Sequence, residues 1–193
     1  MVLAAVDCTG HGVPGALMSI IGSTILNQTV KNAAINTPAD ALGFLNTEVT
    51  KSLNSIKDGM DIALCAIDMK MPQLQYAGAN NPIYIVRGKE FIEIKADKQA
   101  IGADTDNALV KTFTNHVIPL QKGDCVYLFT DGYADQFGGP LGKKFKYKKF
   151  QELLIEMQDN TMEEQRHILN YHHEQWKGGL EQVDDILVIG VRI

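Results

Sequence analysis

Three short apolar segments of this chain each adjoin an aspartate. They are residues 3–6 before Asp7, residues 125–129 before Asp131, and residues 186–193 after Asp184 and Asp185. Each segment has the composition of a β-strand. Carboxylates at the ends of neighbouring strands can meet in space although they are far apart in sequence, and Mg²⁺ and Mn²⁺ prefer oxygen ligands. The sequence therefore predicts a β-rich core with a carboxylate metal centre at its strand ends.

The composition is that of one globular domain. The 193 residues are 45% hydrophobic and 21% charged, with a net charge of −5. This argues against disorder and gives no reason to expect nucleic-acid binding or direct membrane contact. Cys8, Cys65 and Cys125 lack zinc-finger or CxxC spacing, so we expect reduced thiols and a cytoplasmic location.

The order of the expected elements predicts an α+β fold. Helices are expected at 14–34, 37–53, 148–158 and 162–176, with strands at 60–69, 74–79, 83–87, 91–95, 113–120, 124–130 and 185–193. Thr37 is the expected N-cap of the second helix. Its inner face should carry Ala41, Leu42, Leu45 and Val49. The first four of these strands are expected to form an antiparallel meander, and the next two a hairpin.

The first residues already read as a buried strand without a preceding cap or polar tail. Terminal residues are normally solvated. We therefore expect residues 1–193 to be the N-terminally truncated, C-terminal portion of a larger protein.

Each aspartate also has an ordinary structural interpretation. Asp7 could be a turn former, although three glycines among residues 10–15 would let the backbone approach a ligand. Asp131 could belong to a common Asp-Gly turn, and Asp184-Asp185 could simply start a strand. The combination of the three segments is what favours a metal site.

The same segments resemble the metal motifs of a known family. Asp-Cys-Thr-Gly-His-Gly-Val-Pro-Gly-Ala at 7–16, Leu-Phe-Thr-Asp-Gly at 128–132 and Asp-Asp-Ile at 184–186 resemble those of the PPM-type (type 2C) serine/threonine phosphatases. Tyr-Ala-Gly-Ala-Asn-Asn-Pro at 76–82 resembles a turn of the SpoIIE-like and RsbU-like bacterial branch. The resemblance implies a four-layer α-β-β-α sandwich of two antiparallel sheets, one of them lacking N-terminal strands.

The resemblance also implies a site for two Mn²⁺ or Mg²⁺ ions. Its ligands would be Asp7 as a bridge, the Cys8 backbone carbonyl, Asp131 and Asp184, with Gly10, Gly12, Gly132 and Asp185 close around them. The choice between Asp184 and Asp185 follows the first acid of the family's pair. The family's other metal aspartate lies on a strand that would precede residue 1, so the second metal site is expected to be incomplete here.

The implied activity is hydrolysis of phosphoserine or phosphothreonine on a protein by a metal-activated water, in bacterial signal transduction. The implied substrate is a phosphoprotein such as a STAS-type anti-sigma-factor antagonist, and the parent protein could be a membrane-anchored sensor. A homodimer is left open. The alternative is a non-catalytic (pseudophosphatase) interaction domain.

Three other features have two interpretations each. His11 is the candidate general acid, or else a histidine that only ties its loop together. Five lysines between residues 143 and 149 are a solvated face, or a surface for an acidic or phosphorylated partner. We expect His167, His172 and His173 to be surface residues.

Overall fold

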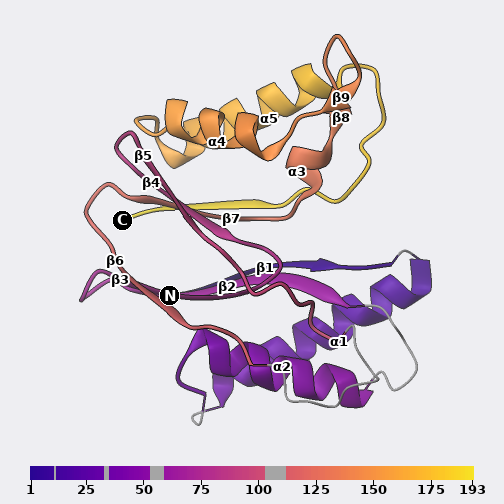
Figure 1. Cartoon of the computed structure of the whole chain (residues 1–193), viewed down its shortest axis with the longest axis vertical. Coiled ribbons are helices and arrows are strands. Elements are labelled where there is room, and N and C mark those ends of the chain that lie inside the picture. The colour runs from indigo at the N-terminus through magenta and orange to yellow at the C-terminus, as the bar shows by residue number, and fades with distance from the viewer. Residues whose placement is uncertain (11, 33–34, 53–58, 103–111) are drawn as a thin grey trace. The chain divides into compact units, whose positions relative to one another are not determined.

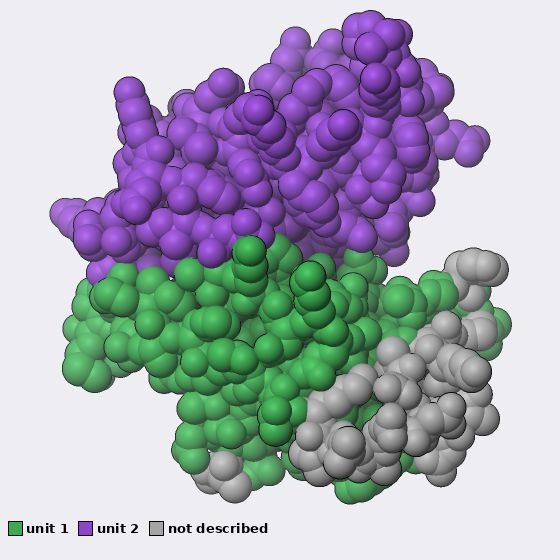
Figure 2. Space-filling view, in the orientation of Figure 1, with its two compact units in different colours: residues 1–82, 94–119 green, residues 83–93, 120–193 purple. Residues whose placement is uncertain are grey.

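The structure is a computed structural model of the chain. It describes residues 1–10, 12–32, 35–52, 59–102 and 112–193. These residues form two compact units, one of residues 1–82 and 94–119, the other of residues 83–93 and 120–193 (Figure 2). We call them unit 1 and unit 2. Among the described residues, no helix is both long enough and apolar enough to span a membrane.

Unit 1 contains one antiparallel sheet covered on one face by two helices (Figure 1). Its elements are β1 (Val2–Cys8), α1 (Gly12–Lys31), α2 (Pro38–Ser52), β2 (Met60–Asp68), β3 (Gln73–Ala79) and β6 (His116–Pro119), with strand order β1-β2-β3-β6. Alternate residues of β1 and β2, including Val6, Cys8, Ile62 and Leu64, pack against the helices. Because side chains alternate along a strand, Asp7 lies on the opposite face of this sheet.

The helices of unit 1 follow from their sequence. The N–H of Asp40 donates to Thr37 Oγ1 (3.1 Å), and the N–H of Thr37 donates to Asp40 Oδ2 (3.2 Å), which confirms Thr37 as the N-cap of α2. The four residues expected on the inner face of α2 are all buried. The first helix runs over Gly12–Lys31, so it begins and ends earlier than the expected 14–34.

Unit 2 contains a second antiparallel sheet with helices on one face (Figure 1). Its elements are β4 (Ile83–Arg87), β5 (Glu90–Ile94), β7 (Cys125–Phe129), α3 (Gly132–Asp135), β8 (Phe137–Gly138), β9 (Lys143–Lys144), α4 (Tyr147–Glu156), α5 (Met162–Lys177) and β10 (Val188–Arg192). The sheet order is β10-β7-β4-β5, and β8 pairs with β9. The core is aromatic: the fully buried ring of Phe150 contacts the rings of Tyr84, Phe129 and Tyr133.

The predicted α+β class with two antiparallel sheets and flanking helices is confirmed, but two pairing predictions were wrong. Strands β6 and β7 do not form a hairpin, because β6 pairs with β3 and β7 lies between β10 and β4. The predicted meander is instead two hairpins in different sheets. The chain leaves the first sheet where Asn80 adopts a left-handed conformation (φ 58°) and Pro82 cannot donate a ladder hydrogen bond.

Candidate metal centre

The segment around Asp131 is fixed against the segment that follows Asp184. Thr130 is buried; its N–H donates to the carbonyl of Leu187 (3.0 Å) and its hydroxyl to the carbonyl of Asp185 (3.0 Å). The hydroxyl oxygen of Thr130 also accepts the N–H of Leu187 (3.0 Å). Asp131 itself is half-buried where β7 ends and α3 begins. Two of the three predicted aspartate segments therefore lie side by side within unit 2.

Gly132 is the residue that permits this close approach. A Cβ atom added there would lie 2.4 Å from the carbonyl oxygen of Asp185, which is closer than real Cβ contacts. The backbone fixes the position of a Cβ atom and of a carbonyl oxygen, so neither could rotate away from this contact. The packing of the segment after Asp184 thus leaves no room for a side chain at Gly132.

Gly132→Ala is expected to displace the Asp184–Asp185 segment and to destabilise the protein by about 1–3 kcal/mol, the usual cost of overpacking a tight contact. Urea unfolding followed by circular dichroism measures this change. Gly179→Ala is the matched control, because a Cβ at Gly179 meets nothing within 4 Å. Equal stability of the two variants would contradict the steric role of Gly132.

The acidic pair lies in an exposed segment before the last strand. Asp184 and Asp185 are both exposed, and the N–H of Asp185 donates to Asp184 Oδ1 (2.8 Å). The last strand begins at Val188, so the expectation that it starts at Asp185 was wrong. The backbone of this segment is held by Thr130, whereas its carboxylates face solvent.

Asp7 lies in unit 1, directly opposite a second aspartate. In the β1–β2 pairing, Asp7 is the register partner of Asp61, so both side chains leave the same face of the sheet. Asn80 Nδ2 donates to Asp61 Oδ1 (2.8 Å). Burial raises the pKa of Asp61, partly opposed by the hydrogen bond from Asn80. Asp61 was not among the predicted site residues, although an acid inside the apolar run 60–69 was a signal.

Cross-strand like charges destabilise a sheet unless something compensates them. A divalent cation held by Asp7 would offset this repulsion, so the donor set around Asp7 fits a hard cation that prefers carboxylate oxygen. Asp131 and Asp184 offer the same donor type in unit 2. Within either unit alone, the described residues contain no group of three His, Cys, Asp or Glu side chains that could hold a metal ion.

The loop after Asp7 is held by hydrogen bonds between the side chain of Thr9 and the backbone of Gly59. Thr9 exchanges hydrogen bonds with Gly59, its hydroxyl donating to the Gly59 carbonyl (2.8 Å) and accepting the Gly59 N–H (2.7 Å). Gly10 (φ 94°) and Gly12 (φ 67°) adopt left-handed conformations that favour glycine. His11, the candidate general acid, lies outside the described residues.

Cys8 points toward the helices of unit 1. Its thiol is half-buried against the core, and this burial raises the pKa of the thiol. A hydrogen bond with Ser19 lowers the pKa, and the charge of Asp7 raises it, but burial has the largest effect. A protonated, inward-facing thiol is a poor nucleophile. Cys65 and Cys125 are buried free thiols, as expected.

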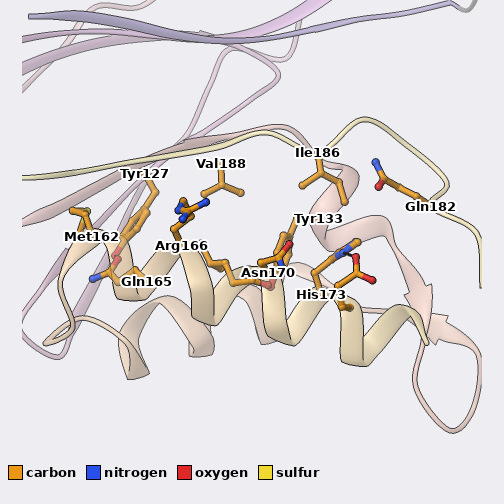
Figure 3. A pocket seen from close by; sticks show the side chains of 13 residues that line it. Tyr127, Tyr133, Met162, Gln165, Arg166, Asn170, His173, Gln182, Ile186 and Val188 are labelled. Carbon is orange, nitrogen blue, oxygen red and sulfur yellow. Dashed lines mark hydrogen bonds and ion pairs between the residues drawn. The ribbon is translucent and has the colours of Figure 1, made fainter. Parts of the chain in front are cut away.

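A separate cavity of about 460 Å³ lies between α5 and β10 in unit 2. Figure 3 shows Arg166, Asn170 and His173 projecting from α5 toward Ile186 and Val188. The expectation that His173 is a surface residue was wrong, because its side chain is only 8% exposed and its ring lies 5.5 Å from that of Tyr133. The candidate aspartates are not among the described residues that line this cavity.

The fold is that of the PP2C phosphatases. The SiaA-PP2C domain of Pseudomonas aeruginosa matches with a TM-score of 0.90 and 31% identity, over 100% of this chain and 75% of that chain. The PP2C phosphatase domain with a fragment of the regulatory domain of SpoIIE from Bacillus subtilis matches with a TM-score of 0.77 and 17% identity. The match covers 99% of this chain and 54% of that chain. The RsbU and RsbW domains of Rv1364c from Mycobacterium tuberculosis match with a TM-score of 0.73 and 20% identity. The match covers 99% of this chain and 51% of that chain.

The family model for Stage II sporulation protein E (SpoIIE) matches residues 1–193. This chain belongs to that family. It spans about half the length of the SpoIIE and Rv1364c chains that it matches. No curated protein sequence matches the chain.

Proposed function

We propose that this chain carries the catalytic residues of a metal-dependent protein serine/threonine phosphatase. Its substrate would be phosphoserine or phosphothreonine on a signalling protein, for which a STAS-type anti-sigma-factor antagonist is the proposed example. The observation that carries the proposal is the hydrogen-bonded pairing of Thr130 with Asp185 and Leu187. This pairing holds two acidic segments of a SpoIIE-family chain next to each other.

The proposed ligands are Asp7, Asp131, Asp184 and the Cys8 backbone carbonyl. When bound, Mn²⁺ or Mg²⁺ would supply an activated water and charge stabilisation for the phosphate oxygens. The chain's own contribution is to position oxygen donors on rigid elements. Asp7 is fixed by the β1–β2 ladder, and the Asp131 backbone is held between the buried Thr130 and the packed Gly132.

His11 is proposed as the group that donates a proton to the leaving seryl or threonyl oxygen, because an imidazole can carry a proton near neutral pH. It lies between Gly10 and Gly12 in the sequence. A His11→Gln variant would separate this role from a purely structural one through the loss of the alkaline limb in the pH–rate profile, because a general acid acts only while it is protonated.

Metal removal tests the proposed function. The natural protein that contains this chain is expected to hydrolyse p-nitrophenyl phosphate with Mn²⁺ and to lose this activity in EDTA, with recovery when Mn²⁺ is added in excess. Release of p-nitrophenolate measures the rate. Activity that is equal with and without Mn²⁺ would contradict the proposed mechanism. Metal binding by calorimetry without turnover would favour the non-catalytic interaction domain.

A further inference from the structure

A second concave surface of unit 2 is strongly basic. It is a pocket of about 530 Å³ beside the β8–β9 hairpin, and we call it the basic pocket. Five lysines line it, together with one glutamate, Glu152. The lysines are Lys143, Lys144, Lys146, Lys148 and Lys149. They are five of the 18 basic residues in a chain whose net charge is −5, so positive charge is concentrated here against the overall balance.

The backbone around the basic pocket is held by contacts between the hairpin and the end of α5. The hairpin packs against Trp176, because the N–H of Gly139 donates to the Trp176 carbonyl (2.7 Å) and Trp176 Nε1 donates to the carbonyl of Gln136 (3.1 Å). A Cβ atom added at Gly138 would lie 1.8 Å from the Trp176 carbonyl oxygen. The hairpin and the end of α5 are therefore in direct backbone contact, and the pocket is formed before any ligand arrives.

Two of the lysines are held in place by this framework. The ammonium group of Lys149 lies 3.8 Å from the centre of the Trp176 ring, a cation–π distance. Lys146 has φ 75° and ψ 147°, a conformation that side-chain-bearing residues rarely adopt, and its N–H donates to the carbonyl of Ala134 (2.7 Å). Strained backbone of this kind is concentrated at binding and catalytic sites.

Most of the positive charge in the pocket is not neutralised by the protein. Lys144 pairs with Asp135 (2.7 Å), and Lys148 lies 4.0 Å from Glu152. Among the described residues, Lys143, Lys146 and Lys149 form no ion pair with a carboxylate. Leu141, which is 76% exposed, adds an apolar wall. The described part of this surface thus offers three lysines without a carboxylate partner beside one apolar contact.

We propose that the basic pocket binds an acidic segment of the protein substrate, next to the phosphorylated residue. This proposal rests on the proposed phosphatase function. The pocket is connected to the candidate metal centre through α3, which begins after Asp131 and ends at Asp135, the partner of Lys144. A compact pocket with an apolar wall suits a peptide better than an extended polyanion, which would also meet the remaining acidic surface of the chain.

Peptide binding without metal tests the proposal independently of catalysis. The probe is a fluorescein-labelled peptide of alternating Glu and Leu, measured by anisotropy in EDTA at low salt and at 0.5 M NaCl. The pocket variant is Lys143→Gln/Lys148→Gln/Lys149→Gln. The matched control is Lys89→Gln/Lys95→Gln/Lys98→Gln, which removes the same charge from exposed lysines outside the pocket.

The pocket variant is expected to weaken binding about tenfold, since each exposed charge pair contributes a few-fold. The control variant should weaken binding less than about twofold, and high salt should abolish most binding of the wild-type protein. Circular dichroism confirms that both variants are folded. In the catalytic arm, the pocket variant should lower kcat/KM for a phosphoserine peptide with an acidic flank and leave p-nitrophenyl phosphate hydrolysis unchanged.

Equal weakening in both variants would overturn the proposal, because only net charge would then matter. Failure of the wild-type protein to bind the peptide would also overturn it. The proposal would also be overturned if the lysines of the pocket were needed for binding of single-stranded RNA or phosphatidylserine vesicles and not for binding of the peptide. If peptide binding behaves as expected while no phosphatase activity is found, the proposed function fails and the acidic-segment site remains.

Discussion

Replacing Asp131 by Asn is expected to lower the Mn²⁺-dependent kcat/KM for p-nitrophenyl phosphate by at least about 100-fold, because a metal ligand supports several kcal/mol of charge stabilisation. Asn preserves the volume of the side chain. The first turn of α3 is held by the backbone hydrogen bond from the Asp135 N–H to the Asp131 carbonyl (3.0 Å), which the substitution does not touch. The fold should therefore persist while turnover is lost.

Asp135→Asn is the matched control for this prediction. It makes the same chemical change one helical turn away, at a carboxylate that pairs with Lys144 on the surface. Surface ion pairs contribute about 0–1 kcal/mol, so this variant should keep its activity and its stability. If Asp131→Asn instead unfolds the protein, Asp131 has a structural role; if it retains full activity, the proposed ligand set is wrong.

The local elements of this fold could be predicted because their signals lie close together in the sequence. Thr37 and Asp40 cap α2 through contacts three residues apart. The core face of α2 follows from helical periodicity, and the burial of Cys125 follows from its apolar run. In each of these cases, neighbouring residues alone decide the conformation.

Strand pairing could not be predicted in the same way. The turn between β6 and β7 is real, with the N–H of Asp124 donating to the Gln121 carbonyl (3.1 Å). However, β7 is buried along its whole length, whereas β6 alternates between partly buried and exposed residues. A central, fully buried strand pairs with a neighbouring strand on each of its two edges. The neighbours of β7 are β4 and β10, which are far away in sequence.

The geometry of the candidate site could not be predicted for the same reason, because it depends on contacts between residues far apart in sequence. The motifs identified Asp131, Gly132 and Asp184, but the two acidic segments adjoin because of the hydrogen bonds of Thr130 and the missing side chain of Gly132, and both depend on contacts with residues far away in sequence. Asp61 was missed because its relation to Asp7 depends on the β1–β2 register. His173 was misassigned because helical spacing does not show which face of α5 is covered.

Arg87→Ala is expected to have the largest effect on stability. Arg87 donates from Nε to Asp124 Oδ1 (2.9 Å) and from Nη2 to Asp124 Oδ2 (2.7 Å), and the Asp124 side chain is only 1% exposed. Removal of Arg87 leaves a buried carboxylate with the Gln121 N–H as its other described donor (2.8 Å). We expect a loss of about 2–4 kcal/mol at pH 7, somewhat below the usual cost because Arg87 is a quarter exposed.

This loss should depend on pH in a defined direction. Burial pushes the pKa of Asp124 upward, but the hydrogen bonds from Arg87 and Gln121 and the charge of Arg87 outweigh burial, so the pKa lies below its ordinary value. A lowered pKa contributes stability above the unfolded-state value of about 4, and this contribution is lost as the pH falls through the folded-state pKa. Without Arg87, burial dominates and the folded protein favours the neutral carboxyl group.

The difference in unfolding free energy between wild type and Arg87→Ala should therefore shrink between pH 7 and pH 3.5. Urea unfolding at the two pH values measures it. The double variant Arg87→Met/Asp124→Leu should recover part of the stability at pH 7, because no charge is then left buried. A difference that is the same at both pH values would show that Arg87 stabilises unit 2 through packing and not through the Asp124 carboxylate.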